Sequence, residues 1–117
     1  MDVVSSKIIE VITHLAFYSG WGNATLAAYI AKDVFETRGI APTALADVTD
    51  NLLPVDEAFE KMRVAAVEQM IGPAFDALAG YTTSVLFHDL WLRPALTPRD
   101  RSLVTVCLLY TSDAADE

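Results

Sequence analysis

The chain has one cysteine, few basic residues and no long hydrophobic run, and each of these shortages excludes a class of protein. Its 117 residues include 8 Lys and Arg against 16 Asp and Glu, so the formal net charge at pH 7 is -8. Proteins that bind nucleic acids or anionic membranes usually present a basic face, so we expect neither partner. No apolar run reaches the roughly 18 residues that a membrane-spanning helix requires.

The amino-terminal sequence also lacks the marks of a secretory signal. No charged segment is followed there by an apolar stretch and a small-residue cleavage site, so we expect a cytoplasmic protein. The single cysteine, Cys107, can form neither an internal disulfide nor a redox-active cysteine pair. Because it lies in the apolar run 104–109, we expect a small buried side chain without a chemical role.

Apolar residues, by contrast, are abundant. They make up 53% of the sequence, and 117 residues suffice for one small domain with a core. The excess predicts that apolar surface is covered by another copy of the chain or by a segment outside it. We therefore expect a homo-oligomer.

The spacing of the apolar residues is helical along most of the chain, and a strand-like alternation competes only over 103–109. The sequence therefore predicts an all-α fold of about five to six helices, arranged as helical hairpins or a bundle. Residues that favour helix amino termini precede four of the helices, namely Ser5 or Ser6, Asn23, Asp56 and Thr97. The expected helices cover about 7–18, 24–37, 57–71, 73–79, 81–91 and 98–110.

The first two expected helices should form a hairpin. The first is apolar around most of its circumference, so we expect it to be buried on more than one side. The second carries a stripe of small residues that allows close approach, formed by Ala24, Ala27, Ala28 and Ala31. The weakly periodic segment 39–55 follows, and we expect a linker with at most one helical turn at about 44–48.

Three functional groups recur at four-residue spacing on the first expected helix: Glu10, His14 and Tyr18. Residues i and i+4 lie over one another on a helix surface, so the carboxylate and the imidazole can meet. Such a pair is common in proton transfer, because each group changes the pKa of the other. A solvated surface pair is the alternative, and the apolar character of the helix argues against it.

Two aromatic residues and a second histidine have weaker claims to a function. Tyr18 is more typical of a core aromatic with a hydrogen-bonded hydroxyl, and Trp21 of a packing anchor at the turn. His88 is more typical of a solvated or capping histidine than of a ligand. No spacing supports a metal site that contains His14 and His88, so we expect no metal.

The arginines Arg93, Arg99 and Arg101 form the only cluster of positive charge. They could bind a substrate carboxylate. Arginines at a helix start are unfavourable for the helix dipole, so we favour pairing with acids such as Asp89 or Asp100, or across a subunit boundary.

Two blocks of the chain resemble the carboxymuconolactone decarboxylase family, which includes the alkylhydroperoxidase D-like proteins. The first block is IEVITHLAFYSGWGNA, residues 9–24, and it continues over 31–35. The second block is YTTSVLFHDLWLRPALTPRDRSLVTV, residues 81–106. Each block is long and detailed, so the resemblance is specific.

The resemblance implies a window on a two-domain protein, because a usual family domain has these two blocks in the opposite order. Residues 1–38 would be the carboxy-terminal half of one domain, 39–55 the linker, and 56–110 the amino-terminal half of the next. The sequence from about Leu108 onward resembles translated adapter sequence, and we expect residues 111–117 to be a disordered tail.

For activity, the resemblance implies a cofactor-independent carboxy-lyase that acts on a small lactone. Glu10 or His14 would move a proton while a carboxylate leaves as carbon dioxide, and His14 or Tyr18 would stabilise the enolate-like charge. The residues that would contact the substrate are Tyr18, Trp21, Arg93 and Arg101.

Two other functions stay open. An alkylhydroperoxidase or peroxiredoxin-type activity would require paired cysteines near His14, and the sequence has none there. A non-catalytic helical oligomerisation module would require no chemistry from Glu10 or His14. The helices that would close a family-like pocket are missing from the chain, so we expect full activity from the intact parent rather than from this piece.

Overall fold

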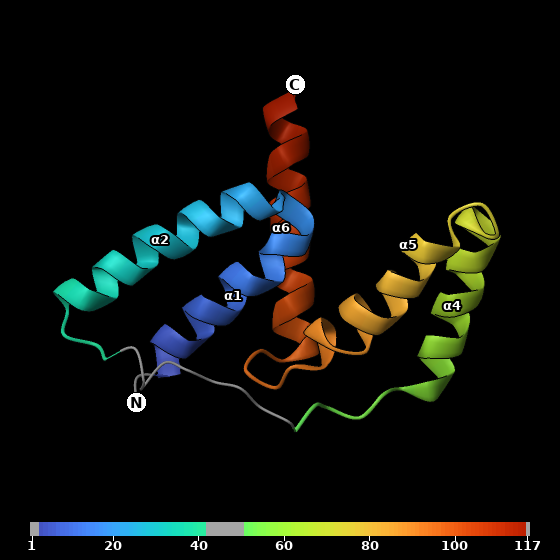
Figure 1. Ribbon diagram of the computed structural model, residues 1–117, viewed down its shortest axis with the longest axis horizontal. Coiled ribbons are helices and arrows are strands. Elements are labelled where there is room, and N and C mark those ends of the chain that lie inside the picture. The colour runs from blue at the N-terminus through green and yellow to red at the C-terminus, as the bar shows by residue number, and fades with distance from the viewer. Residues whose placement is uncertain (1–2, 42–50, 117) are drawn as a thin grey trace. The chain divides into compact units, whose positions relative to one another are not determined.

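The computed structural model describes the backbone of residues 3–41 and 51–116 and the side chains of residues 5–41 and 51–111. Within these ranges every regular element is helical, which confirms the predicted all-α fold (Figure 1). The five α-helices described are α1 (Val3–Ser19), α2 (Trp21–Thr37), α4 (Glu57–Ile71), α5 (Asp76–Tyr81) and α6 (Pro98–Asp116). Two short elements, the π-helical η1 (Thr82–Phe87) and the 3-10 turn η2 (Leu90–Leu92), follow α5.

Contacts between residues divide the chain into two units. The first contains α1, α2 and α6, and the second contains α4, α5, η1 and η2. The first unit therefore joins segments from the two ends of the sequence. The domain boundaries proposed from the sequence refer to a longer parent protein and stay a prediction.

In the first unit, α1 and α2 form the expected hairpin, and Gly20 makes the turn (Figure 1). Gly20 has a φ of 98°, which a residue with a side chain rarely adopts, and it precedes α2 as the N-cap residue. The prediction that Asn23 caps α2 is therefore wrong. Its side-chain amide instead donates a hydrogen bond to the Ser19 carbonyl at 2.8 Å.

The small-residue stripe predicted on α2 lies mostly on the less exposed side of that helix. Ala24, Ala27 and Ala31 are half-buried, whereas Ala28 is exposed, so three of the four predicted positions lie on the less exposed side of α2. No residue of α2 is fully buried. The prediction that α1 is buried on several sides is wrong in part, because apolar residues such as Phe17 remain exposed.

Two of the predicted helix caps are confirmed. The Asp56 carboxylate accepts a hydrogen bond from the Phe59 N–H at 3.1 Å, which starts α4. The Thr97 hydroxyl accepts one from the Asp100 N–H, also at 3.1 Å, which starts α6. The predicted cap at Ser5 or Ser6 is wrong, because α1 already begins at Val3.

Other boundaries differ from the sequence-based prediction. The fourth expected helix starts at Asp76 rather than at 73, and 82–92 folds as η1 and η2 instead of one α-helix. The last helix continues beyond residue 110 to Asp116, so residues 111–116 are helical where a disordered tail was expected. The predicted turn at 44–48 lies outside the described residues.

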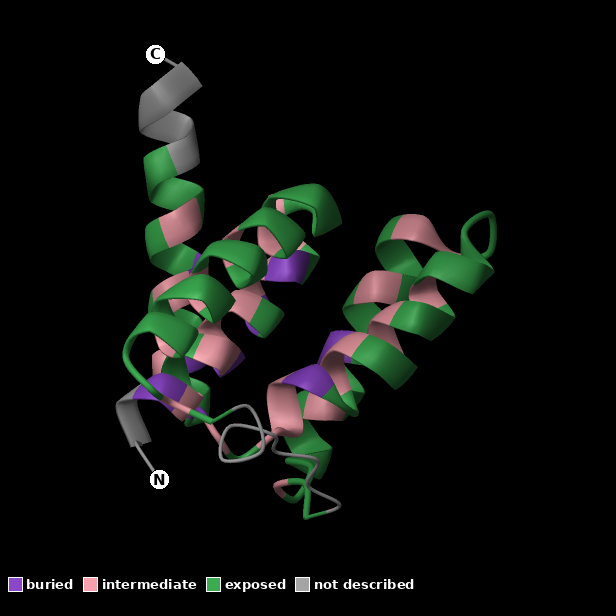
Figure 2. Cartoon of the chain, turned by 60° about the vertical axis from the view of Figure 1, so that its left-hand side comes forward, coloured by how far each residue is buried: buried purple, intermediate pink, exposed green. Residues whose placement is uncertain are grey.

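Few apolar side chains are fully buried in the described part of the chain. The buried hydrophobic residues are Ala16, Leu90 and Leu96. The buried polar residues are more numerous and comprise Ser5, Glu10, His14, Arg63, Arg101 and Thr105. Figure 2 shows the same balance, with buried positions confined to short stretches of mostly exposed helices.

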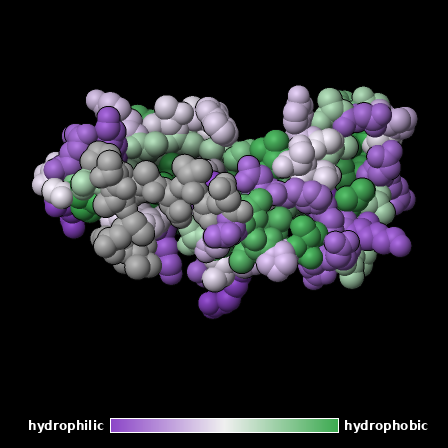
Figure 3. All heavy atoms as spheres, turned by 60° about the horizontal axis from the view of Figure 1, so that its bottom comes forward, coloured by the Kyte–Doolittle hydropathy of each residue, from purple (hydrophilic) through white to green (hydrophobic). Residues whose placement is uncertain are grey.

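The exposed surface is correspondingly apolar. Large hydrophobic side chains on it include Trp21, Tyr29, Met62 and Met70, and Figure 3 shows hydrophobic atoms gathered between hydrophilic ones. Cys107 is exposed as well, so the prediction that it is buried is wrong. None of the helices in the described residues combines the length and the apolar character needed to cross a membrane.

Candidate active site

Four polar side chains from opposite ends of the sequence meet inside the first unit. Glu10 and His14 lie one turn apart on α1, and Arg101 and Thr105 lie one turn apart on α6. Because residues i and i+4 share a helix face, each helix presents its pair to one side, and α1 packs on α6. His14 and Arg101 are completely buried, while Glu10 is 2% exposed and Thr105 is 9% exposed.

Arg101 connects the two predicted catalytic residues. Its Nη2 donates a hydrogen bond to Glu10 Oε1 at 2.8 Å, and its Nη1 donates to His14 Nδ1 at 3.1 Å. The Glu10–Arg101 ion pair is shielded from water, with side-chain exposures of 3% and 0%. A charge-assisted hydrogen bond in such surroundings fixes the geometry of both partners.

The hydrogen bonds around His14 select one tautomer of its imidazole. A guanidinium has no acceptor, so Nδ1 of His14 must be the unprotonated nitrogen. The Thr105 hydroxyl donates to the Arg101 carbonyl at 2.7 Å, so its oxygen accepts the hydrogen on His14 Nε2, also at 2.7 Å. His14 is therefore neutral, with its proton on Nε2 and a lone pair directed at Arg101.

The electrostatic surroundings agree with a neutral imidazole. Burial, and after it the positive charge of Arg101, lower the pKa of His14 from its ordinary value of 6.5 to about 4. The negative charge of Glu10 opposes both effects. At neutral pH the imidazole is consequently uncharged, and its one unprotonated nitrogen, Nδ1, accepts the hydrogen bond from Arg101.

This buried cluster consists of Glu10, His14, Arg101 and Thr105. The structure brings some, but not all, of the other predicted site residues to it. The Tyr18 ring stacks on His14, with ring centroids 5.3 Å apart, and is half-buried. Trp21 is 68% exposed and contacts Phe17 edge to face instead. Arg93 follows η2 in the second unit, so its predicted role in substrate binding stays a prediction.

Arg101 pairs with an acid as expected from the sequence, but the acid is not one of the two named there. Its partner is Glu10, which lies 91 positions away in the sequence, and not the adjacent Asp100. Arg99 is the arginine that approaches Asp100, at 4.0 Å and with a side chain that is 90% exposed. Local charge pattern could not identify the partner of Arg101, because that partner is supplied by the packing of another helix.

Thr105 was missed by the sequence reasoning, although a signal for it existed. Arg101 and Thr105 have the same four-residue spacing as Glu10 and His14, and they lie on a strongly apolar helix. Buried polar residues are normally hydrogen-bonded. Two such pairs on two apolar helices could therefore have been matched with each other.

A second polar cluster, also missed, lies in the second unit. Arg63 on α4 donates to both carboxylate oxygens of Glu60 and, from Nη2, to the Thr83 hydroxyl at 2.9 Å. His88 Nε2 lies 2.7 Å from Glu60 Oε1, so this partly exposed histidine is hydrogen-bonded to a carboxylate rather than merely solvated. The Arg63 hydrogen bonds lower the pKa of Glu60, and His88 acts in the same direction against the opposing effect of burial.

Within the side chains that the structure describes, no three His, Cys, Asp or Glu residues lie close enough together to hold a metal ion.

Comparison of the chain with models of protein families gives no match, and a search of curated proteins finds no significant relative.

Proposed function

We propose that this chain carries the proton-transfer site of a small-molecule carboxy-lyase that acts on a carboxylated lactone. The observation that carries the proposal is the buried hydrogen-bonded chain from Glu10 through Arg101 to His14. It places a carboxylate, a guanidinium and a neutral imidazole together away from water, where their mutual electrostatic effects are strong. The substrate class comes from the resemblance of the two sequence blocks.

Arg101 is the group to which we assign the substrate carboxylate. A guanidinium donates charge-assisted hydrogen bonds to carboxylates, and Nη2 of Arg101 already donates one to Glu10. A carboxylate that replaced His14 as the partner of Nη1 would leave Glu10 in place to orient the guanidinium. Glu10 is then a positioning residue, and His14 becomes free to exchange a proton.

The proton transfer follows from the dependence of the His14 pKa on Arg101. Arg101 lowers this pKa and Glu10 raises it. A bound carboxylate would offset the charge of Arg101, so His14 Nδ1 would take up a proton from solvent more readily. The imidazolium would then be the general acid of the reaction.

In the bond-breaking step, the carbon–carbon bond to the carboxylate breaks and its electron pair moves into the conjugated lactone carbonyl. Carbon dioxide leaves, and the positive charge of Arg101 is no longer offset by the substrate carboxylate. The pKa of the imidazolium falls, and Nδ1 passes its proton to the carbon of the enolate. We assign Tyr18, stacked on His14 and half-buried, to contact with the substrate ring.

The proposal is tested by assaying the full 117-residue chain with γ-carboxymuconolactone and measuring the release of carbon dioxide. We expect His14→Ala to lower kcat by about 100-fold or more, the usual effect of removing an acid–base group. Glu10→Gln, which weakens the group that positions Arg101, should lower kcat to a similar extent. Thr13→Ala is the matched control, because Thr13 is exposed on the same helix. Full turnover in both folded variants, or absence of turnover both in the unmodified chain and in an intact parent that contains it, would reject the proposal.

A non-catalytic oligomerisation module is the second candidate function. The exposed apolar side chains of α2, which include Trp21, Leu26 and Tyr29, favour it. Analytical ultracentrifugation, read together with the activity assay, separates the two functions. If the chain is an oligomerisation module, it self-associates, Glu10→Gln leaves that self-association unchanged, and the unmodified chain shows no turnover.

A further inference from the structure

The second polar cluster, formed by Glu60, Arg63, Thr83 and His88, ends in an exposed imidazole. It shares no residue with the site to which we assign the decarboxylation. The Arg63 side chain is 7% exposed, that of Glu60 is 16% exposed and that of His88 is 42% exposed. The cluster therefore leads from a buried guanidinium, through one carboxylate, to a histidine that solvent can reach.

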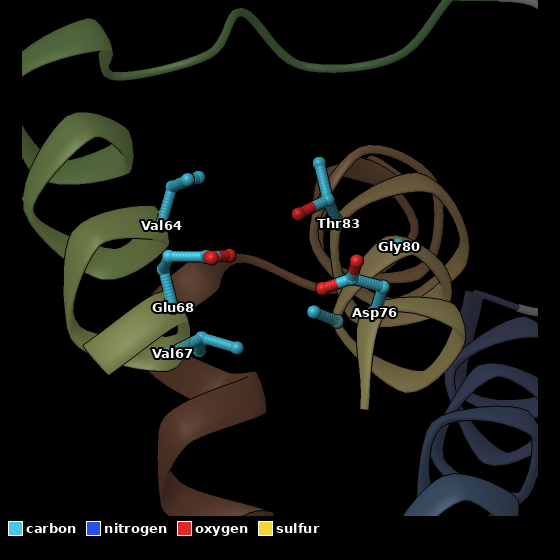
Figure 4. Close-up of a pocket in the computed structure, with 7 residues that line it drawn as sticks. Val64, Val67, Glu68, Asp76, Gly80 and Thr83 are labelled. Carbon is cyan, nitrogen blue, oxygen red and sulfur yellow. The ribbon is translucent and has the colours of Figure 1, made fainter. Parts of the chain in front are cut away.

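Arg63 gives the Glu60 carboxylate a fixed orientation. Its Nε donates a hydrogen bond to Glu60 Oε2 at 2.8 Å, and its Nη2 donates to Glu60 Oε1. The same Nη2 donates to the Thr83 hydroxyl at 2.9 Å, and Figure 4 shows this hydroxyl turned from η1 toward α4. The guanidinium also lies over the Phe87 ring, 4.4 Å from its centroid. Because contacts with two elements hold the arginine, its two hydrogen bonds hold the carboxylate.

The backbone after η1 brings His88 to this carboxylate. The His88 N–H donates to the Thr83 carbonyl, five residues earlier, at 2.9 Å. Such π-helical turns often occur at functional sites. The ring then reaches α4, where Nε2 lies 2.7 Å from Glu60 Oε1, although the two residues are 28 positions apart in the sequence. The fold therefore builds a contact between an imidazole and a carboxylate that is itself anchored by an arginine.

The hydrogen bond to Glu60 determines which nitrogen of His88 is reactive. The Arg63 hydrogen bonds lower the pKa of Glu60, so this group is a carboxylate at neutral pH and only accepts hydrogen bonds. In the neutral imidazole the proton consequently lies on Nε2, and the lone pair lies on Nδ1. Among the described residues, none is hydrogen-bonded to Nδ1. An imidazole oriented by a carboxylate, with its other nitrogen open to solvent, has the arrangement of an activated nucleophile.

We propose that His88 is an acyl-transfer nucleophile, and that its substrates are small uncharged esters. The imidazole of His88 contacts the substrate, whereas Glu60 and Arg63 are positioning residues that act through it. Glu60 carries a negative charge beside the ring, and the chain as a whole carries a net charge of -8. Anionic esters are therefore repelled, and uncharged ones are not.

In the first step, the Nδ1 lone pair forms a bond to the carbonyl carbon of the ester, and the bond from that carbon to the alcohol oxygen breaks. The alcohol leaves as an alkoxide or phenolate with the bonding electron pair. The acylated ring keeps its proton on Nε2 and carries a positive charge, which the Glu60 carboxylate stabilises. Water then adds to the acyl carbon, the carbon–Nδ1 bond breaks, and its electron pair returns to Nδ1. The carboxylic acid and one proton pass to solvent.

Diethylpyrocarbonate, an uncharged acyl donor, tests the nucleophile in the full chain. Its product on an imidazole can be located by mass spectrometry of peptides. We expect His88 to be acylated about tenfold faster than N-acetylhistidine, because one charge-assisted hydrogen bond supports the cation that forms. Glu60→Gln should remove this advantage, whereas Lys61→Gln, which changes an exposed residue of α4, should leave it unchanged. Reaction of His88 at the rate of N-acetylhistidine would overturn the proposal.

Release of p-nitrophenolate from p-nitrophenyl acetate measures the complete reaction. His88→Gln keeps a hydrogen-bond donor for Glu60 and has no nucleophilic nitrogen, so it should fold and lose the protein-dependent release. Mono-p-nitrophenyl succinate, which is anionic, should react more slowly than the acetate. Full release by His88→Gln, or faster reaction of the succinate, would overturn the proposal.

Nitrogen NMR of the His88 ring separates positioning from stability. Nε2 should carry the proton in the unmodified chain, because the Glu60 carboxylate only accepts hydrogen bonds. In Glu60→Gln the amide can accept or donate, so the proton should be distributed over both ring nitrogens. An unprotonated Nε2 in the unmodified chain would overturn the assignment of Glu60 as the positioning residue.

Discussion

Arg101 donates a hydrogen bond from Nη1 to Nδ1 of His14 at 3.1 Å, and this contact joins residues 87 positions apart in the sequence. The guanidinium can only donate, so the contact also fixes the neutral tautomer of the imidazole. The same guanidinium holds Glu10. The chemistry of the predicted Glu10–His14 pair therefore depends on a residue from the other end of the chain.

The first prediction concerns the stability that this arginine provides. Arg101→Met removes the cation that pairs with Glu10, whose side chain is 3% exposed. Removing one partner of a buried ion pair typically costs about 3–5 kcal/mol, and we expect a loss of that order in the free energy of unfolding. Urea denaturation followed by circular dichroism measures it. Arg99→Met is the control, because that side chain is 90% exposed, and equal losses in the two variants would contradict the prediction.

The second prediction is a loss of stability in mild acid that His14 causes. The folded-state pKa of about 4 lies below the ordinary 6.5, so between these values the unfolded chain binds the extra proton. Stability is therefore complete above about pH 6.5 and decreases as the pH falls toward 4, by an amount on the order of 3 kcal/mol. Urea denaturation from pH 4 to 7 should show this slope in the native chain and a smaller one in His14→Gln. Parallel curves for the two proteins would reject the assignment to His14.

The third prediction isolates the hydrogen bond between Thr105 and His14. Thr105→Val removes the acceptor of the Nε2 proton, and leaving a buried donor unsatisfied costs about 1–3 kcal/mol. Thr111→Val is a close control, because the Thr111 hydroxyl makes the same bond to the carbonyl four residues earlier but is exposed. Thermal unfolding should therefore show a distinctly lower Tm for the Thr105 variant. If the two Tm values coincide, Thr105 does not anchor the imidazole.

The fourth prediction concerns the second unit, where Glu60 holds both Arg63 and His88. Glu60→Gln should cost about 2 kcal/mol at neutral pH, because charge-assisted hydrogen bonds to a buried guanidinium are lost. The pKa of Glu60 is lowered, so its contribution is present above its ordinary value of 4.5 and is lost as the pH falls below it. Lowering the pH below 4.5 should consequently reduce the free energy of unfolding less in Glu60→Gln than in Glu57→Gln. The opposite order would refute the role of Glu60.

Much of the fold could be predicted because it depends on short-range pattern. Asp56 and Thr97 cap their helices as expected, since a side-chain oxygen reaches an N–H only three residues away. The cap predicted at Asn23 was wrong, because Gly20 adopts the positive φ of the turn and α2 therefore begins earlier in the sequence. The prediction that Cys107 is buried was wrong, because an apolar run does not show which face of a helix packs against a neighbouring element.

By itself, the amino-acid sequence determined that the chain is helical, where the hairpin turns, and that Glu10 and His14 share one face of α1. These properties follow from neighbours within a few positions, and such neighbours are fixed by the covalent chain. Only the tertiary structure decided that Arg101 and Thr105 complete the cluster and that His14 is buried and neutral. The physical reason is that desolvation and pairing arise from the packing of α6 on α1, which no local pattern specifies.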